Sequence, residues 1–175
     1  MKNVCYYHGD ADGIVSGAIV KEFFKNHTID VECIKVNYGD MPKYEKNLEN
    51  CIVVDFSFDK KTMEKLIDNS KNFIWIDHHK TAKDKLENLW EDKKIYGIRN
   101  LNYAGCYLTW EYFFPKCTIT SPVKYIGDRD IWKFEFGKDT KAFYETFNLK
   151  YKEVNNNVIL DIFVRDCEED YIEKG

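Results

Sequence analysis

The chain has 175 residues, of which 44% are hydrophobic and 16% aromatic. This is the size of one domain with a core of its own, and the apolar content excludes a disordered chain. The formal net charge of -4 argues against a broad basic surface for duplex nucleic acid. No apolar run approaches the roughly 20 residues of a membrane span, and the first residues do not resemble a signal peptide. The six cysteines form no CxxC pair, so we expect reduced thiols in a cytoplasmic protein that does not bind membranes.

The first half of the chain alternates between two patterns. β-rich runs occupy residues 4–7, 31–36, 51–54 and 73–76, a fifth is expected at 95–98, and helical spacing covers 14–26, 44–49 and 60–69. Strands that alternate with helices are typical of βαβ units, and strands that are almost entirely apolar indicate helices on both faces. We therefore predict an α/β fold, a three-layer sandwich with a mostly parallel five-stranded sheet and helices on both faces.

The strict alternation of strands and helices ends in the second half of the chain. Residues 103–114 have helical spacing that Pro115 ends, an apolar run covers 123–126, and 139–147 is a further predicted helix. Residues 158–171 carry an apolar stripe that we expect to dock as a helix. We divide the chain into a main domain, residues 1–150, and a C-terminal helix or linker remnant, residues 151–175. The four tryptophans are expected in the core, although Trp132 could instead line a site next to Asp130.

Four polar clusters directly follow apolar runs. They are His8 to Gly13 with Asp10 and Asp12, then Asp55, then Asp77-His78-His79, and finally Gly127-Asp128-Arg129-Asp130. In a parallel sheet the carboxyl ends of the strands share one edge, where ligands bind. The first three clusters should therefore converge in space, and the fourth can join them. Each cluster taken alone could be a helix cap, a turn or a surface feature, but their joint placement favours a site.

Six aspartates in one crevice cannot all stay ionised without a counter-charge, and divalent metal is the simplest one. Carboxylates and imidazoles together suit Mn²⁺, Mg²⁺, Fe²⁺ or Zn²⁺, whereas the absence of cysteine argues against a structural zinc site. So many ligands exceed the needs of one ion. A pair of ions would use them, and such a pair can generate a hydroxide and hold the oxygens of a phosphoryl centre.

In this order, the four motifs resemble those of the DHH phosphoesterase superfamily over about residues 3–135. The resemblance rests on His8-Gly9-Asp10-Ala11-Asp12-Gly13-Ile14, Val54-Asp55, the triplet Asp77-His78-His79, and Gly127-Asp128. Members of this superfamily share a parallel five-stranded sheet and usually a pair of manganese ions. They include single-strand exonucleases, nanoRNases, cyclic-dinucleotide phosphodiesterases, exopolyphosphatases and pyrophosphatases.

The resemblance implies a role for each motif residue. His8 and Asp10 would bind one metal ion, and Asp12, His78 and Asp128 the other. Asp55 would bridge the two ions and so hold the nucleophile, Asp77 would orient a neighbouring imidazole from the second shell, and His79 would contact the phosphate as a catalytic residue. The fourth motif requires one aspartate, and Asp128 is favoured over Asp130 because it directly follows the apolar run and the glycine. The implied cofactors are two divalent ions, with Mn²⁺ preferred and Mg²⁺ or Co²⁺ also suitable.

The expected activity is hydrolysis of a phosphodiester in a short single-stranded oligonucleotide or a cyclic dinucleotide. The enzyme alternative is an exopolyphosphatase or pyrophosphatase, and the non-enzyme alternative is a non-catalytic DHH-like nucleotide-binding module. A phospho-receiver domain with Asp55 as its acceptor is disfavoured by the three histidines. Most family members carry a second domain with a glycine-rich substrate-binding motif, which is not found here. Either the chain is the catalytic half of a longer protein, or a partner or a second copy would supply the missing lid.

Overall fold

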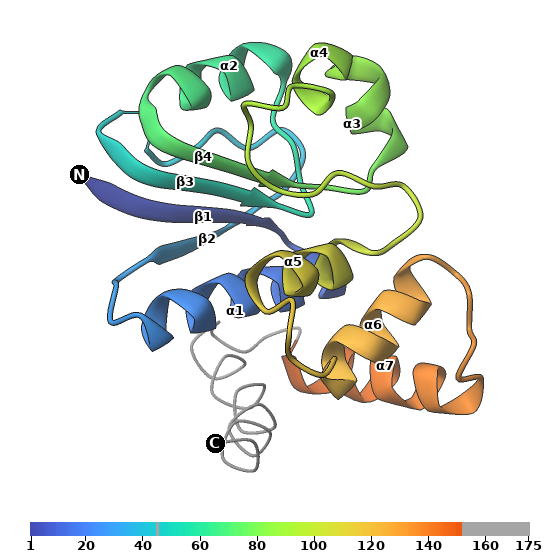
Figure 1. Ribbon diagram of the computed structural model, residues 1–175. Helices are drawn as coiled ribbons and strands as arrows, with labels where there is room; N and C mark the ends of the chain where they lie inside the picture. The colour runs from blue at the N-terminus through green and yellow to red at the C-terminus, as the bar shows by residue number, and fades with distance from the viewer. Residues whose placement is uncertain (45, 152–175) are drawn as a thin grey trace.

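The computed structural model describes residues 1–44 and 46–151 and contains a parallel four-stranded sheet (Figure 1). The strands are β1 (Lys2–His8), β2 (Glu32–Val36), β3 (Leu48–Val54) and β4 (Ser70–Ile76), in the order β2-β1-β3-β4. All three neighbouring pairs are parallel, so the carboxyl ends of the strands meet at one edge. The predicted α/β class and the parallel sheet are thus confirmed.

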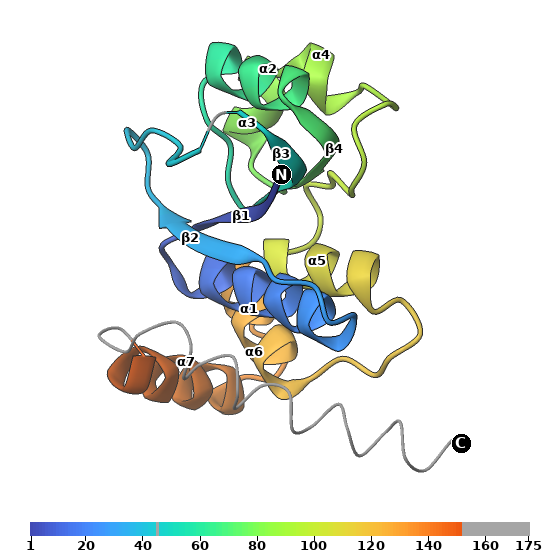
Figure 2. The same ribbon diagram turned by 90° about the vertical axis from the view of Figure 1, so that its left-hand side faces the viewer.

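Seven helices surround the sheet in the described part of the chain. They are α1 (Ala11–Asn26), α2 (Lys60–Asp68), α3 (Lys80–Lys85), α4 (Glu87–Trp90), α5 (Gly105–Phe113), α6 (Ser121–Asp130) and α7 (Lys138–Tyr151). Helices α2, α3 and α4 cover one face of the sheet, and α1 and α5 cover the other (Figures 1 and 2). Helices α6 and α7 pack together beneath α1 and α5. The predicted coverage of both faces is therefore confirmed.

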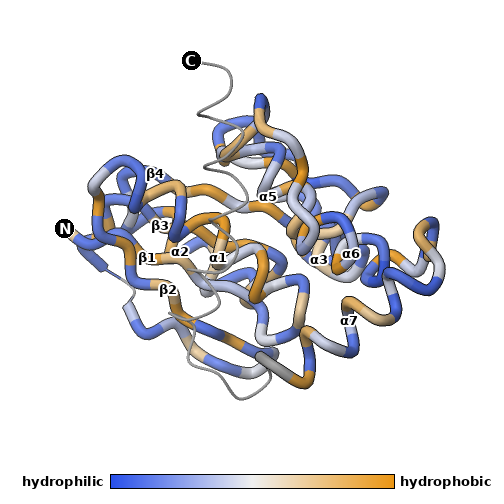
Figure 3. The backbone as a smooth tube through the Cα atoms, turned by 90° about the horizontal axis from the view of Figure 1, so that it is seen from below, coloured by the Kyte–Doolittle hydropathy of each residue, from blue (hydrophilic) through white to orange (hydrophobic). Residues whose placement is uncertain are grey.

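The central strand β1 divides the core into two halves. Val4 and Tyr6 face the hydrophobic cluster on the α2 side, whereas Cys5 and Tyr7 face the one that includes α1 and α5. All four residues are at most 2% exposed. This alternation follows from the two-residue period of a strand. Burial on both faces explains why residues 4–7 of β1 and 51–54 of β3 are all apolar or aromatic, and Figure 3 gives the hydropathy along the backbone.

The predicted fifth strand is present only in part. Tyr96 and Arg99 form isolated parallel bridges with Ile74 and Asp77 of the β4 region, and no continuous strand connects them. Gly97 interrupts the pairing, because its φ of +113° is not a strand conformation, and a Cβ there would lie 2.2 Å from the carbonyl oxygen of Trp75. The count of five strands is therefore corrected to four.

Two further expectations from the sequence are wrong, and the setting of the fourth cluster becomes clear. Residues 46–49 do not form a helix, since Leu48 already belongs to β3 and pairs with Lys2 and Ser70. The apolar run 123–126 lies inside α6, so the fourth polar cluster ends a helix and does not follow a strand. Trp132 is 70% exposed and not part of the core.

Several other expectations concern the surface and the C-terminal region. Within the described residues, no helix is long and apolar enough to cross a membrane. The five cysteines described there are free. The predicted helix at 158–171 lies outside the described residues, and the assignment of a remnant from residue 151 onward stays a prediction.

Arg99 fixes the segment that runs along β4. Its guanidinium donates hydrogen bonds to the carbonyl oxygens of Trp90 (2.8 Å) and Trp75 (3.2 Å). It also donates to the carbonyl oxygens of Asp92, Ile95 and Tyr96. One cationic side chain thus donates hydrogen bonds to five backbone carbonyl oxygens.

Replacing Arg99 should therefore destabilise the fold. We expect Arg99→Ala to lower the free energy of unfolding by about 3 kcal/mol, because hydrogen bonds to a charged donor are lost and part-buried carbonyls lose their partner. Urea unfolding monitored by circular dichroism measures this change. Lys94→Ala, at an exposed position in the same segment, should change stability by less than about 0.5 kcal/mol. Equal effects of the two substitutions would contradict the role given to Arg99.

Candidate metal centre

The turn from β1 into α1 brings the first motif together. Asp10 caps α1, with Oδ1 accepting a hydrogen bond from the Gly13 amide at 2.9 Å. Its Oδ2 lies 2.9 Å from His8 Nδ1. Only a glycine fits at position 13, because a Cβ there would lie 2.2 Å from the carbonyl oxygen of His8. The strand therefore passes into the helix without a loop, and this holds His8, Asp10 and Asp12 close together.

Asp12 connects this turn to the start of α5. Its two carboxylate oxygens accept hydrogen bonds from the backbone amides of Gly105 (2.7 Å) and Cys106 (2.8 Å). These amides are among the first of the helix, which lack partners within it. Asp12 is 1% exposed, so the bond is a buried, charge-assisted link between residues more than ninety positions apart.

Asp55 lies at the carboxyl end of β3 and at the centre of the site. It is fully buried, and its φ of +51° is unusual for a residue other than glycine. Neither carboxylate oxygen has a hydrogen-bond partner among the described residues. Gly105 leaves room for this side chain, since a Cβ at Gly105 would lie 2.7 Å from both Cβ and Oδ1 of Asp55. A strained, buried and unpaired carboxylate of this kind indicates a functional residue.

The triplet after β4 is ordered by its own aspartate. Asp77 is completely buried, and its Oδ1 accepts hydrogen bonds from the backbone amide of His78 (2.8 Å) and from that of His79 (3.1 Å). The same oxygen lies 2.8 Å from Nδ1 of the His79 ring. Asp77 therefore fixes both the backbone and the ring of His79, as a positioning residue would.

His78 points into a group of three carboxylates. Its Nε2 lies 3.2 Å from Asp55 Oδ1, 3.4 Å from Asp130 Oδ2 and 3.6 Å from Asp12 Oδ2. Two of these carboxylates come from the sheet edge and the start of α1, and the third comes from the end of α6. The fourth sequence cluster thus joins the other three through Asp130.

Asp128 points elsewhere. Its carboxylate accepts hydrogen bonds from the backbone amides of Glu135 (2.9 Å) and Phe136 (3.4 Å) and from the hydroxyl of Thr140. These contacts hold the connection between α6 and α7. The sequence-based preference for Asp128 over Asp130 does not fit this arrangement, because residues two apart on a helix face different directions.

Three groups of side chains place possible ligand atoms within 4.8 Å of one another in the described residues. They are His8-Asp10-Asp55, Asp12-His78-Asp130 and Asp55-His78-His79. Asp55 belongs to two of the three groups, and its oxygens are 3.2 Å from His78 Nε2 and 4.0 Å from His8 Nδ1. The unpaired, buried Asp55 oxygens and the mixed oxygen and nitrogen donors fit divalent cations.

The pKa values of two carboxyl groups in the site are raised, because the site is buried and crowded with negative charge. Burial, followed by the charges of Asp12 and Asp10, raises the pKa of Asp55 well above its usual range. The same causes raise the pKa of Asp130 to about 8. Without cations these carboxyl groups therefore keep protons that ordinary aspartates lose near pH 4.

The pKa values of the two histidines of the triplet are shifted in opposite directions. Burial lowers the pKa of His78 below its usual value, in spite of the carboxylates around it. Burial would also lower the pKa of His79, but the hydrogen bond and charge of Asp77 outweigh it and raise the pKa. His78 is thus the better neutral ligand, and His79 is the better proton donor.

Two residues next to the carboxylate cluster belong to none of the four sequence motifs. Gly105 binds Asp12 through its amide and packs against Asp55, and the only signal in the sequence is a glycine at the start of a helical pattern. Tyr38 lies with its ring centroid 5.4 Å from that of His8 and 5.1 Å from that of Phe56. It comes from the connection between β2 and β3, which carries no motif.

Comparisons with known proteins agree with this arrangement. The uncharacterized protein R106 of Acanthamoeba polyphaga mimivirus is 33% identical over 168 residues, which cover 84% of this chain and 39% of R106. The crystal structure of an uncharacterized protein from Helicobacter pylori G27 is 18% identical, with a TM-score of 0.65 over 94% of this chain and 56% of that chain. At this identity the likeness shows the fold alone. The chain spans about two fifths of the first protein and just over half of the second.

The family is shown by a different comparison. A model of the DHH family, N-terminal domain, matches residues 3–126, which is most of the chain and contains β1 to β4, α1 and α5. The matched region includes the turn with Asp10 and Asp12, the buried Asp55 and the triplet that begins at Asp77. The chain therefore belongs to the DHH family of the phosphoesterase-type superfamily.

Proposed function

We propose that this domain hydrolyses phosphodiester bonds, in a short single-stranded oligonucleotide or a cyclic dinucleotide, with two divalent cations of which Mn²⁺ is preferred. Proteins of the DHH family generally use divalent metals, and this chain retains a side chain for each ligand position. The observation that carries the proposal is Asp55, a buried carboxylate that has no hydrogen-bond partner among the described residues and belongs to two ligand groups.

The ligand groups suggest how the ions would be held. His8 and Asp10 would bind one cation, and Asp12, His78 and Asp130 the other, with Asp55 between them. Asp130 takes the place that the sequence suggested for Asp128. When bound, the cations would supply an activated water and neutralise the charge of the phosphate. Two backbone amides of α5 already hold the Asp12 carboxylate in place, so little conformational entropy would be lost when it binds a cation.

The protein's own proton chemistry centres on His79. Asp77 Oδ1 binds its Nδ1, which leaves Nε2 as the nitrogen that can donate to a phosphate or leaving oxygen. Asp77 raises the pKa of His79 above its usual value, so its ring holds a proton more readily than a free imidazole does. We therefore assign His79 to protonate the leaving oxygen, with Asp77 keeping the ring in position.

The proposal is tested by a panel of phosphodiesters and phosphoanhydrides in Mn²⁺. We expect hydrolysis of phosphodiesters and a loss of about a thousandfold or more in Asp55→Asn, since the amide cannot serve both cations. Asp59→Asn is a matched control, because Asp59 is an ordinary helix cap of α2. Activity of Asp55→Asn above a tenth of the unsubstituted protein would contradict the central role of Asp55. A preference for pyrophosphate or polyphosphate would replace the phosphodiester with the phosphoanhydride alternative.

The stability of the metal-free protein should fall as pH rises from 6 to 8. In this window folded Asp130 and Asp55 bind protons that the unfolded chain has already released, so each step upward in pH favours unfolding. One retained proton corresponds to roughly 1.4 kcal/mol per pH unit below its folded pKa. Urea unfolding in EDTA at the two pH values measures the change.

Manganese should reverse this trend, because cations bind the ionised carboxylates and release the protons. Saturating Mn²⁺ should therefore stabilise the protein more at pH 8 than at pH 6. Stability in EDTA that rises with pH would show that the cluster does not hold protons in the folded state.

Asp130 and Asp128 should separate metal binding from stability. Asp130→Asn should weaken Mn²⁺ binding at least about tenfold and leave the fold intact, because its carboxylate faces His78. Asp128→Asn should keep the Mn²⁺ affinity but lower the free energy of unfolding by about 1–3 kcal/mol, because its hydrogen bonds join α6 to α7. Calorimetric titration with Mn²⁺ and thermal unfolding distinguish the two. The reverse pattern would restore Asp128 as the ligand.

A further inference from the structure

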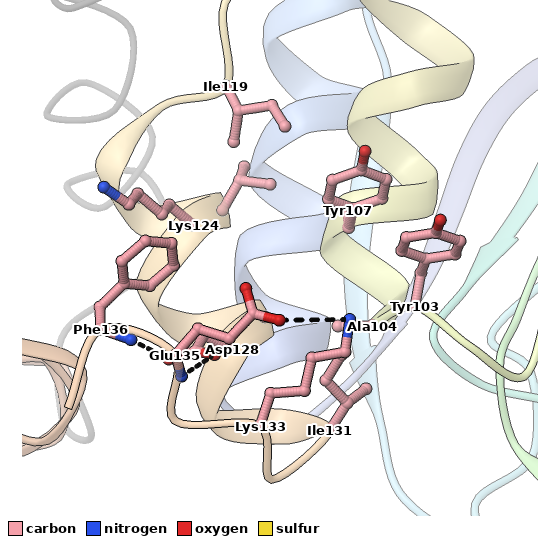
Figure 4. A pocket seen from close by; sticks show the side chains of 12 residues that line it. Tyr103, Ala104, Tyr107, Ile119, Lys124, Asp128, Ile131, Lys133, Glu135 and Phe136 are labelled. Carbon is pink, nitrogen blue, oxygen red and sulfur yellow. Dashed lines mark hydrogen bonds and ion pairs between the residues drawn. The ribbon is translucent and has the colours of Figure 1, made fainter.

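A cavity lies between α5 and α6 (Figure 4). Its volume is about 350 Å³, within the range of small-molecule sites. Tyr103 and Tyr107 form the wall on the α5 side, and Ile119 and Lys124 stand opposite them on the α6 side. Phe136 closes one end. We call this cavity the α5–α6 pocket.

The pocket combines aromatic walls with a cationic rim. The rings of Tyr103 and Tyr107 stack at a centroid distance of 4.8 Å and an angle of 14°. Lys124 Nζ lies 4.1 Å from the ring centroid of Phe136, and Lys133 Nζ lies 5.7 Å from that of Tyr103. Tyr103 is 39% and Phe136 38% exposed. Flat aromatic faces next to ammonium groups suit a planar aromatic ligand that carries negative charge.

The pocket also has hydrogen-bonding groups that could discriminate between such ligands. Glu135 and Lys133 line it and lie 3.8 Å apart across its lower edge (Figure 4). The carboxylate of Asp128 lines the pocket too, but it is occupied by the backbone amides of Glu135 and Phe136. Asp128 thus shapes the pocket by fixing two of its lining residues.

Two short segments form both the pocket and the metal centre. Ala104 lines the pocket, and the amide of the next residue, Gly105, binds Asp12. Ile131 lines the pocket, and the preceding residue, Asp130, faces His78. Because these lining residues directly adjoin Gly105 and Asp130 in the chain, the pocket and the carboxylate cluster lie next to each other.

We propose that the α5–α6 pocket binds the base and sugar of the nucleotide that carries the scissile phosphate. The base stacks against Tyr103 and Tyr107, and the lysines attract the nucleotide's phosphates. This inference rests on the proposed function, because it places the reacting phosphate at the metal centre. It assigns part of substrate recognition to residues 103–136 of this domain.

The test compares two esters with the same leaving group, the p-nitrophenyl ester of thymidine monophosphate and methyl p-nitrophenyl phosphate. Only the first carries a nucleoside, so the ratio of their kcat/KM values in Mn²⁺ reports its recognition. We expect this ratio to fall roughly tenfold in Tyr103→Ala, the effect of losing one base–aromatic stack. Ile119→Trp, which fills the mouth of the pocket, should lower it as well. The methyl ester serves as the internal reference in each variant, because a change at the metal centre alone would alter both esters alike and leave the ratio unchanged.

Tyr96→Ala is the matched control, because Tyr96 is an exposed tyrosine that does not line the pocket. It should leave the ratio unchanged. If both esters are hydrolysed and neither pocket variant alters the ratio, the inference is wrong and the proposed function stands.

If neither ester is hydrolysed, the proposed function fails. Titration with thymidine monophosphate then tests separately whether the pocket binds a nucleotide. Calorimetric binding that Ile119→Trp abolishes, with no comparable binding of inorganic phosphate, supports nucleoside recognition. No binding, or equal binding of inorganic phosphate, overturns it.

Discussion

The arrangement of this domain depends on one buried carboxyl group, Asp55, that lies among other carboxylates and accepts no hydrogen bond from the described residues. Asp55 ends the central strand β3 in a left-handed backbone conformation, and its oxygens have no hydrogen-bond partner among the described residues. Burying such a group is unfavourable unless something else compensates its charge. The neighbouring elements increase the cost, because Asp12 and Asp10 lie close enough to raise its pKa further. Such a site suits the binding of cations, because a bound cation would attract each of the carboxylates that otherwise repel one another.

The link from Asp12 to α5 explains how a helix far along the chain is held at the sheet edge. Its two oxygens bind the first amides of α5, and Gly105 at this point has no side chain to displace Asp55. The helix N-terminus contributes partial positive charge to the carboxylate cluster. Helix α6 packs against α5 and ends at Asp130, which faces His78. The buried hydrogen bonds of Asp12 thus position α5, and through α5 both Asp130 and the wall of the neighbouring pocket.

Sequence reasoning located the centre of the site better than its periphery, for a physical reason. Asp10, Asp55 and Asp77 follow strands of a parallel sheet, and the topology of such a sheet brings strand ends to one edge whatever the intervening loops do. Asp128 and Asp130 follow no strand. Which of them faces the site depends on the rotation of α6 about its axis, and the packing of Gly127 near Ala104 and Cys106 sets that rotation. The short sequence Val123-Lys124-Tyr125-Ile126 contains no information about this packing. The same limit applies to Gly97, whose backbone conformation breaks the expected fifth strand.

The position of the aromatic pocket bears on how recognition and chemistry are divided in this domain. The proposed metal ligands come mostly from the sheet edge and the start of α1, next to the buried core. The pocket is formed by α5, by α6 and by the connection from α6 to α7, and its residues Tyr103 and Phe136 remain exposed. Arg99 fixes the segment ahead of Tyr103 through five backbone carbonyls, and Asp128 fixes the segment that contains Phe136. Recognition elements held in this way can differ in sequence without disturbing the ligands, because the two sets share only the short stretches around Gly105 and Asp130.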